Sequence, residues 1–244
     1  MNTYKLGKQN PKLDLRTIRC GRYFTPELPT PPDSLDLSSA VSGGYPMDGN
    51  DQFGDCGFAG LHHHIQTLRA NANQDALPLT EQDVIDAYFA FTGGADSGVV
   101  LLDVLNKWNN EGFFGTDTIG AFASVNIQNQ TEVKQAINLF GGLYCGVELP
   151  LDWQGKDSWL MPSDLKGDNA PGSWGGHCVF TASYDSGGVT VVSWGTLIYV
   201  SWDAWDAYFS EAYAVLDSDW FKSDGISPTG LDMDTLKDDL SLVS

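Results

Sequence analysis

The spacing of apolar residues changes from a helical to a strand-like pattern about halfway along the chain. Between residues 56 and 140 the apolar side chains recur every three or four positions, which predicts helices that bury one face. From residue 141 onward they form short runs rich in β-branched and aromatic residues, separated by glycine or aspartate turns. Helices followed by an antiparallel sheet predict an α+β fold with two subdomains.

Four helices are expected in the first of these parts. The first begins at Cys56 and carries a core-facing stripe of Phe58, Leu61, Ile65 and Leu68. The second follows a capping box at residues 80–83, and the third passes through residues 101–108. Thr131 is expected to cap the fourth helix, which Gly141 ends. The expected strands of the second part cover residues 143–149, 178–184, 189–194, 197–201 and 212–216, with a short helix at 202–209.

Three segments follow from these patterns. Residues 1–45 form a basic, proline-rich arm, because its prolines exclude long helices. Residues 46–216 hold the α+β domain, mainly helical over 46–140 and mainly antiparallel β over 141–216. Residues 217–244 form an acidic tail, in which a short helix is expected at 232–242.

The acidic charge of the chain is unevenly distributed. A net charge of −19 and an isoelectric point near 4.2 make nucleic acid an unsuitable partner. Residues 1–22 carry six basic residues and one acidic residue, a net charge of +5, so the remainder carries −24. A basic arm on an acidic body predicts docking, either onto the protein's own surface or onto a neighbouring molecule.

Several other classes of protein are disfavoured. No apolar run approaches the ~20 residues of a membrane span, and the N-terminal residues lack the apolar region of a secretory signal, so synthesis in a cytoplasm is expected. The four cysteines lack metal-type spacing and are expected to stay reduced.

Residues 62–64 are three histidines, but consecutive helical positions point ~100° apart and cannot converge on one ion. We therefore expect no metal and no cofactor.

Cys56 is the candidate nucleophile. It opens an amphipathic helix, and the partial positive charge of a helix N-terminus favours a thiolate. Gln52 precedes it by four residues and is a candidate donor to the oxyanion that forms when a carbonyl is attacked. His177, in a glycine-flanked segment of the β-rich part, is the candidate general base. A cysteine from the first helix and a histidine from the sheet would meet in the cleft between the two parts.

This arrangement resembles the papain-like cysteine peptidases across residues 46–216. Gln52 and Cys56 stand where that family has its oxyanion-hole glutamine and its nucleophile, and residues 79–86 resemble the helix that follows the nucleophile. Residues 175–180 and 193–196 resemble the family's histidine strand and its Asn-Ser-Trp-Gly turn. Residues 49–56, 192–195 and 211–216 are also similar to uncharacterised papain-like proteins encoded by tailed bacteriophages and some bacteria. This second resemblance implies a phage-encoded protein made in a host cytoplasm and a candidate component of the virion.

One departure from the family pattern concerns the residue that orients the histidine. The resemblance places Val192 where the family has asparagine, and valine cannot accept a hydrogen bond from imidazole. Three alternatives follow: Ser193 or a backbone carbonyl orients the ring, the site is a Cys–His dyad, or the site is inactive.

Two functions from different classes are therefore expected. The first is a papain-like peptidase or amidase that uses Cys56, His177, Gln52 and Ser193 on a peptide or related amide. The alternative is a catalytically inactive virion protein, a capsid decoration or tail-associated component, that binds capsid or tail proteins through residues 1–45. The charge asymmetry, the proline-rich arm and Val192 favour the alternative.

Overall fold

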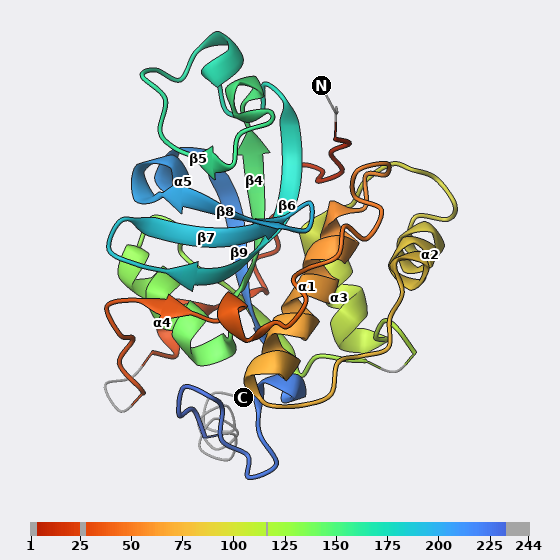
Figure 1. Cartoon of the computed structure of the whole chain (residues 1–244), viewed down its shortest axis with the longest axis vertical. Coiled ribbons are helices and arrows are strands. Elements are labelled where there is room, and N and C mark those ends of the chain that lie inside the picture. Colours follow the sequence, from red (N-terminus) through yellow and green to blue (C-terminus); the bar gives the residue numbers. More distant parts are fainter. Residues whose placement is uncertain (1–3, 25–27, 116, 233–244) are drawn as a thin grey trace.

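In the computed structural model, which describes residues 4–24, 28–115 and 117–232, a helical part lies beside a large sheet (Figure 1). The helical part consists of α1 (Cys56–Asn71), α2 (Glu81–Phe91) and α3 (Leu101–Asn110). Two further helices, α4 (Gln130–Phe140) and α5 (Trp202–Tyr208), lie with the sheet. Short 3-10 helices span Cys20–Arg22, Ser38–Ala40, Leu151–Trp153, Gly167–Asn169 and Ser218–Trp220.

The helices form where the sequence pattern places them. The α1 stripe of Phe58, Leu61, Ile65 and Leu68 is completely buried, as the three-to-four-residue spacing predicts. Helix α2 begins with the expected capping box, in which the Thr80 side chain accepts from the Asp83 backbone N–H and the Asp83 carboxylate accepts from the Thr80 N–H.

The N-terminal cap of α4 differs from the expectation. Asn129, rather than Thr131, is the cap, and its side chain accepts a hydrogen bond from the Glu132 N–H at 3.3 Å. Asparagine caps at least as well as threonine, so the helix begins one residue before Thr131. Gly141 ends α4 in the left-handed region with φ of 79°, as predicted.

The sheet has nine strands within the described residues and is mainly antiparallel. Its strand order is β1-β3-β9-β4-β6-β7-β8-β5, and β2 pairs with β6 outside this path. Strand β6 is central, because it lies between β4 and β7. Strand β4 runs antiparallel to it over Leu143↔Thr181 to Leu149↔Gly175. The strands are β1 (Ile18–Arg19), β2 (Leu35–Asp36), β3 (Ala121–Ser124), β4 (Leu143–Leu149), β5 (Ser158–Trp159), β6 (Gly175–Tyr184), β7 (Gly188–Ser193), β8 (Thr196–Ser201) and β9 (Phe209–Leu216).

Alternation of side chains across the central strands produces two main cores. Tyr144, Cys178 and Tyr213 point to the side of the sheet that packs against α1, α2 and α3. Their neighbours Cys145 and Val179 belong to the other cluster, which contains α4, α5 and several tryptophans. Cys178 therefore lies in the core between the sheet and α1, and His177 points to the opposite side of β6.

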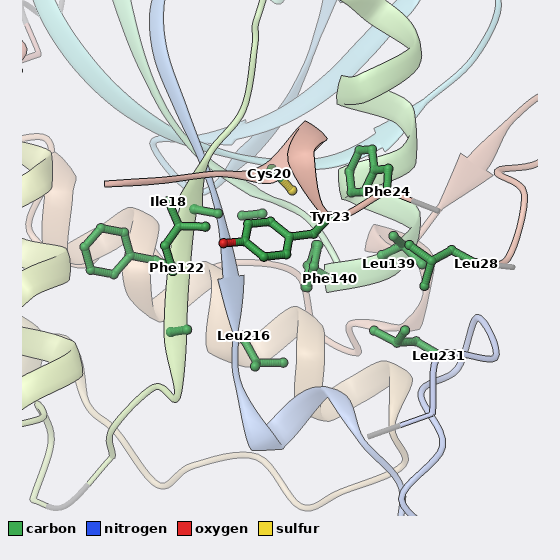
Figure 2. A pocket seen from close by; sticks show the side chains of 13 residues that line it. Ile18, Cys20, Tyr23, Phe24, Leu28, Phe122, Leu139, Phe140, Leu216 and Leu231 are labelled. Carbon is green, nitrogen blue, oxygen red and sulfur yellow. The ribbon is translucent and has the colours of Figure 1, made fainter. Parts of the chain in front are cut away.

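The arm packs along the body and adds strands to the sheet. Strand β1 pairs in parallel with β3, and β2 pairs antiparallel with the end of β6. Apolar arm residues also close a pocket against β3, α4 and β9 (Figure 2). The arm residues that line this pocket are Ile18, Cys20, Tyr23, Phe24 and Leu28.

The α+β fold expected from the sequence is confirmed, with differences at the ends of strands and with four strands, β1, β2, β3 and β5, that were not expected. Strand β6 begins at Gly175 rather than Cys178, because β4 is long enough to pair with residues 175–177. Strand β9 begins at Phe209 rather than Ala212, directly after α5. The helix expected at 232–242 lies almost entirely outside the described residues.

Candidate active site

Cys56 and the histidine strand meet at an open edge of β6. Strand β7 pairs with β6 only from Phe180↔Val192 onward, so within the described part of the chain no strand pairs with the edge of residues 175–178 on that side. Gly176 and Cys178 point their backbone polar groups toward this edge, since groups two residues apart on a strand face the same way. The Cys178 N–H faces the sulfur of Cys56, the first residue of α1. The residue next to His177 thus touches the candidate nucleophile directly.

The Cys56 side chain is a buried thiol. It is 1% exposed, and burial raises its pKa to about 11. Backbone N–H groups of Cys178 and Gly7 face the sulfur and lower the pKa, but they only partly offset the burial. At neutral pH Cys56 is therefore protonated in this structure.

Asp55, the residue before Cys56, is also affected by burial. Its pKa is raised to about 8, mainly because the carboxyl group is removed from water, although the Asn50 side-chain amide donates to it at 3.2 Å. A carboxyl group that is mostly neutral at pH 7 opposes a neighbouring thiolate less than an ionised one would.

His177 is held on two sides by residues of the turn after β7. Its Nε2 lies 2.8 Å from Ser193 Oγ, and its ring stacks on the Trp194 indole with centroids 4.4 Å apart and planes at 17°. Nδ1 is buried and has no hydrogen-bond partner among the described residues. Burial lowers the pKa of His177 to about 3, so the imidazole is neutral.

The turn that presents Ser193 and Trp194 is a tight β-hairpin. Ser193 pairs with Thr196, and the two residues between them have positive φ angles, 49° at Trp194 and 69° at Gly195. Such a turn favours glycine or asparagine at both positions, and a bulky tryptophan in the left-handed region is strained. This backbone conformation places the Trp194 ring against the His177 imidazole.

The remaining site candidates are placed as follows. Val192 points into a separate small cluster with Phe180 and Ala182, away from the imidazole. Of the alternatives for orienting His177, a hydrogen bond with Ser193 is the one present in the structure. Gln52 lies in the loop before α1 with an exposed side chain. Cys56 and His177 make no hydrogen bond to each other in the described part of the chain.

The first described residues of the arm fill the space between Cys56 and the histidine strand. The Lys8 N–H donates to the Gly176 carbonyl at 3.1 Å, and on the other side the Val99 N–H donates to the Gly7 carbonyl at 2.7 Å. The Gln9 N–H donates to the Val99 carbonyl at 2.8 Å. Residues 4–9, the arm segment, are thus bonded to both subdomains.

Gly7 is the point of closest approach. A Cβ on Gly7 would lie 1.8 Å from the Gly54 carbonyl oxygen, and a Cβ on Gly98 would lie 2.1 Å from the Gly7 carbonyl oxygen. These contacts are with backbone atoms that cannot rotate away, so only glycine fits. The absence of side chains at these positions lets the arm backbone reach the Cys56 sulfur.

Side chains on either side of Gly7 anchor the arm segment. Tyr4 stacks on Trp194 with centroids 4.6 Å apart, and therefore covers the indole that stacks on His177. Lys5 forms an ion pair with Asp96, which also accepts from the Gly54 N–H at 2.9 Å. The Lys8 side chain is completely buried and ion-paired with two glutamates. The docking expected from the charge asymmetry occurs onto the protein's own surface.

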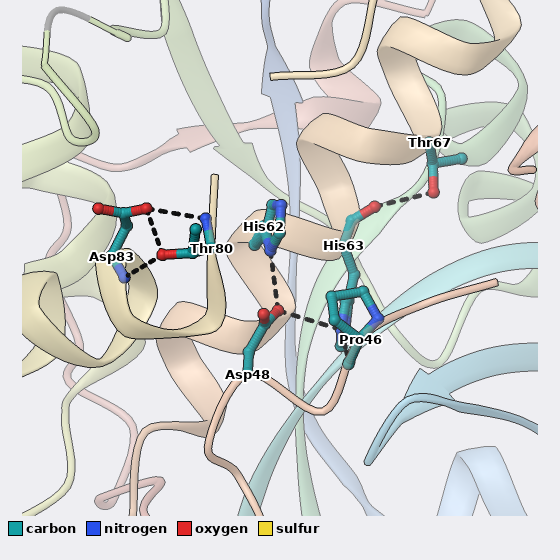
Figure 3. Close-up of polar contacts among 7 residues, drawn as sticks. All are labelled: Pro46, Asp48, His62, His63, Thr67, Thr80 and Asp83. Atoms are coloured by element: carbon teal, nitrogen blue, oxygen red, sulfur yellow. Dashed lines mark hydrogen bonds and ion pairs between the residues drawn. The ribbon is translucent and has the colours of Figure 1, made fainter. Parts of the chain in front are cut away.

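The three consecutive histidines are buried, and two of them contact a buried carboxyl group. His62 Nδ1 lies 2.9 Å and His63 Nε2 3.5 Å from Asp48 Oδ2 (Figure 3). His63 Nε2 also lies 2.8 Å from the Pro46 carbonyl oxygen. His64 packs between Trp108 and Phe180. Across residues 4–24, 28–115 and 117–232, no three His, Cys, Asp or Glu side chains are grouped to bind a metal ion.

Comparison with solved structures identifies the fold. The chain is similar to xylellain, a cysteine protease from Xylella fastidiosa, with a TM-score of 0.69 and 14% identity over 88% of this chain and 97% of that one. It is similar to digestive procathepsin L 3 of Tenebrio molitor larval midgut, with a TM-score of 0.59 and 14% identity over 88% of this chain and 76% of that one. It is also similar to procathepsin B S9 from Trypanosoma congolense, with a TM-score of 0.59 and 10% identity over 89% of this chain and 87% of that one. The protein therefore has the papain-like cysteine protease fold.

Sequence-based comparison gives no further assignment. No protein-family model matches the sequence, and no curated protein matches it. Within the described residues, no helix has the length and apolar character needed to cross a membrane.

The sequence interpretation missed the residues that the arm contributes to the site. Tyr4 stacks on Trp194, Gly7 faces the Cys56 sulfur, and Lys8 is ion-paired with two glutamates. The charge asymmetry predicted that the arm would dock, but no local pattern specified where. Glycines at 7, 54, 98 and 176 were the available signal, since each allows two backbones to approach closely.

Proposed function

We propose that the protein is a cysteine peptidase that acts on peptide bonds and is held latent by its own arm segment, residues 4–9. One observation carries the proposal: the backbone of Gly7 lies against the Cys56 sulfur, beside a histidine whose Nε2 is held by Ser193 and whose Nδ1 has no hydrogen-bond partner among the described residues. The papain-like fold supports the reaction type.

The reaction follows from the roles these residues can take once the arm segment leaves. His177 Nδ1 takes the Cys56 proton, and the thiolate attacks the carbonyl carbon of the substrate. The carbon–nitrogen bond breaks, the leaving amine receives the proton from His177, and an acyl thioester remains on Cys56. Water, deprotonated by His177, hydrolyses the thioester and regenerates the thiol.

The oxyanion of each tetrahedral intermediate needs hydrogen-bond donors. The Cys56 N–H lies at the N-terminus of α1, where backbone N–H groups lack partners within the helix. Gln52, exposed in the preceding loop, supplies a side-chain amide as the second donor in this proposal.

Latency has two physical causes. The group that the arm presents to the sulfur is the N–H of Gly7, a donor, and not a carbonyl carbon that a thiolate can attack. Burial under the arm also keeps the thiol and the imidazole neutral, with pKa values of about 11 and about 3. An unburied pair would exchange the proton far more readily, because the ion pair would then be solvated.

Two of the similar structures are described as proforms of cathepsins, which is consistent with latency in this chain. The alternative, an inactive virion component, is less well supported, because the arm makes an extended set of contacts with its own body. Phage origin remains a prediction from the sequence resemblance.

Peptide cleavage by the full chain tests the proposal. Gly7→Ala cannot keep the arm segment in place, because its Cβ would collide with the Gly54 carbonyl. We expect the Gly7→Ala protein to cleave an unfolded protein substrate, the wild type to cleave it at least ~10-fold more slowly, and Gly7→Ala/Cys56→Ala to be inactive. A folded Gly7→Ala protein that cleaves nothing, or cleavage that survives loss of Cys56, would refute the proposal.

A further inference from the structure

The Lys8 side chain occupies a site built for a cation. Its Nζ lies 2.7 Å from Glu148 Oε1 and 3.5 Å from Glu211 Oε1, and the side chain is 0% exposed. Burying an ammonium group is costly unless it is paired, so the two carboxylates determine what this site accepts. We call the surroundings of this side chain, Gly146, Glu148, Gly176 and Glu211, the Lys8 site.

The carboxylates are held in place by their own partners. Ser210 Oγ donates to Glu148 Oε1 at 3.2 Å, and the Tyr213 hydroxyl donates to Glu211 Oε2 at 2.8 Å. The other oxygen of Glu211, Oε1, is buried and has no hydrogen-bond partner in the described residues. Glu211 Oε1 lies 3.5 Å from the Lys8 ammonium. A side chain whose positive group extends slightly further than that of lysine could therefore donate a hydrogen bond to Glu211 Oε1.

Two glycines provide room for Lys8: Gly146 for its side chain and Gly176 for its backbone. A Cβ on Gly146 would lie 2.2 Å from Lys8 Cε, and a Cβ on Gly176 would lie 2.5 Å from the Lys8 carbonyl oxygen. Any larger residue at 146 would fill the path along which the lysine stem reaches the carboxylates. The site therefore accepts a long, unbranched stem with a positive charge at its end.

The Lys8 site adjoins the nucleophile. Gly7, the residue before Lys8, faces the Cys56 sulfur, and the Lys8 N–H is bonded to Gly176, the residue before His177. When the arm segment leaves, the site opens within one or two residues of the place where a substrate carbonyl is attacked.

We propose that the Lys8 site selects peptide substrates with a lysine or arginine side chain at the first or second residue before the cleaved bond, with Glu211 and Glu148 as the specificity-determining residues. Lys8 fills this site in the latent state. An arginine guanidinium carries five donors in a planar fork and is suited to reach both carboxylates. This inference rests on the proposed peptidase function.

Covalent labelling of the full-length protein tests the inference separately from that function. The background is Gly7→Ala/Lys8→Ala, in which the arm is displaced and Lys8 cannot compete for its own site. The probes are short peptidyl acyloxymethyl ketones with arginine, lysine, norleucine or glutamate at the first or second position from the reactive group. Mass spectrometry measures the labelling rate of Cys56, and iodoacetamide reports the thiol without a side-chain preference.

We expect arginine and lysine probes to label Cys56 about 10-fold or more faster than the norleucine probe at one of the two positions, as charge-assisted hydrogen bonds require. Adding Glu211→Gln or Glu148→Gln should reduce that ratio toward one. Glu132→Gln, a glutamate that contacts Gly21 of the arm and lies outside the Lys8 site, should leave the ratio high.

Two other outcomes overturn the inference in distinguishable ways. Labelling without a preference for basic probes, or a preference that survives both glutamine substitutions, rejects the specificity site and leaves the peptidase proposal standing. A Cys56 that neither iodoacetamide nor any probe labels faster than in the wild type rejects the peptidase proposal and this inference together.

Discussion

The imidazole of His177 is hydrogen-bonded at Nε2 to Oγ of Ser193, 2.8 Å away, the residue that follows Val192. The hairpin turn after β7 places the hydroxyl there and stacks Trp194 on the same ring. One nitrogen is thereby fixed, and the other, Nδ1, has no hydrogen-bond partner among the described residues.

Ser193→Ala should weaken this orientation. In the Gly7→Ala background we expect the rate of Cys56 alkylation near pH 6 to fall roughly 10-fold, because one hydrogen bond to the imidazole is lost. Ser193→Thr, which keeps the hydroxyl, should restore most of the rate and the pH profile. If the pH profile of Cys56 alkylation is the same for Gly7→Ala/Ser193→Ala as for Gly7→Ala, Ser193 does not position the His177 ring.

Tyr4→Ala should loosen the arm segment. Tyr4 stacks on Trp194, and an aromatic pair of this kind contributes about 1 kcal/mol beyond the area it buries. We expect iodoacetamide to label Cys56 about 5-fold faster in this variant than in the wild type, because the segment is released more often. Tyr23→Ala, which removes an arm tyrosine from the apolar pocket in Figure 2, is the matched control. If both variants label Cys56 at the same rate, the Tyr4 stack does not hold the segment.

Asp55→Asn should stabilise the protein at alkaline pH. Burial raises the pKa of Asp55 to about 8, so the stability contributed by its neutral form is complete below pH ~4 and is lost as pH rises to about 8. Asparagine does not ionise and keeps an acceptor for Asn50. Urea unfolding should show little difference at pH 4 and a gain on the order of a few kcal/mol at pH 8.

The control for Asp55→Asn is Asp51→Asn, at an exposed position in the same loop. A gain that is the same at pH 4 and pH 8, or that Asp51→Asn reproduces, would mean that the buried Asp55 carboxyl is not its source.

His64→Leu should make the protein less sensitive to acid. Burial lowers the pKa of His64 to about 3, so folded stability is lost as pH falls from ~6.5, where the unfolded histidine takes up a proton, toward 3. Both ring nitrogens lack hydrogen-bond partners in the described residues, so leucine removes no bond. The difference in unfolding free energy between the variant and the wild type should shift in favour of the variant as pH falls from 7 to 4. A pH-independent difference would contradict a buried neutral His64.

The fold could be predicted largely because its signals are local. The spacing of Phe58 and Leu61 along α1, and Gly141 after α4, specify helices and their ends through contacts within a few residues. The shortest strands, β1, β2 and β5, could not be predicted, since two-residue pairings depend on segments far apart in the sequence.

The candidate site was only partly predictable for a similar reason. Cys56 and His177 are indicated by their local context, and the structure places them on adjoining elements. The position of Gly7 against the sulfur depends on glycines at 54 and 98 that approach it only in the folded chain. A charge count along the arm contains no information about that geometry.

The pH dependence of Cys56 alkylation in the full-length protein tests latency by the arm segment most directly. We expect slow labelling of the wild type that rises only toward the thiol pKa of about 11, and fast labelling of Gly7→Ala near pH 6 that disappears when His177→Ala is added. Gly21→Ala, an arm substitution whose Cβ would lie nearest to the flexible end of the Glu132 side chain, should behave as the wild type does. A Gly7→Ala profile that coincides with the wild type, or fast labelling that persists without His177, would contradict the account.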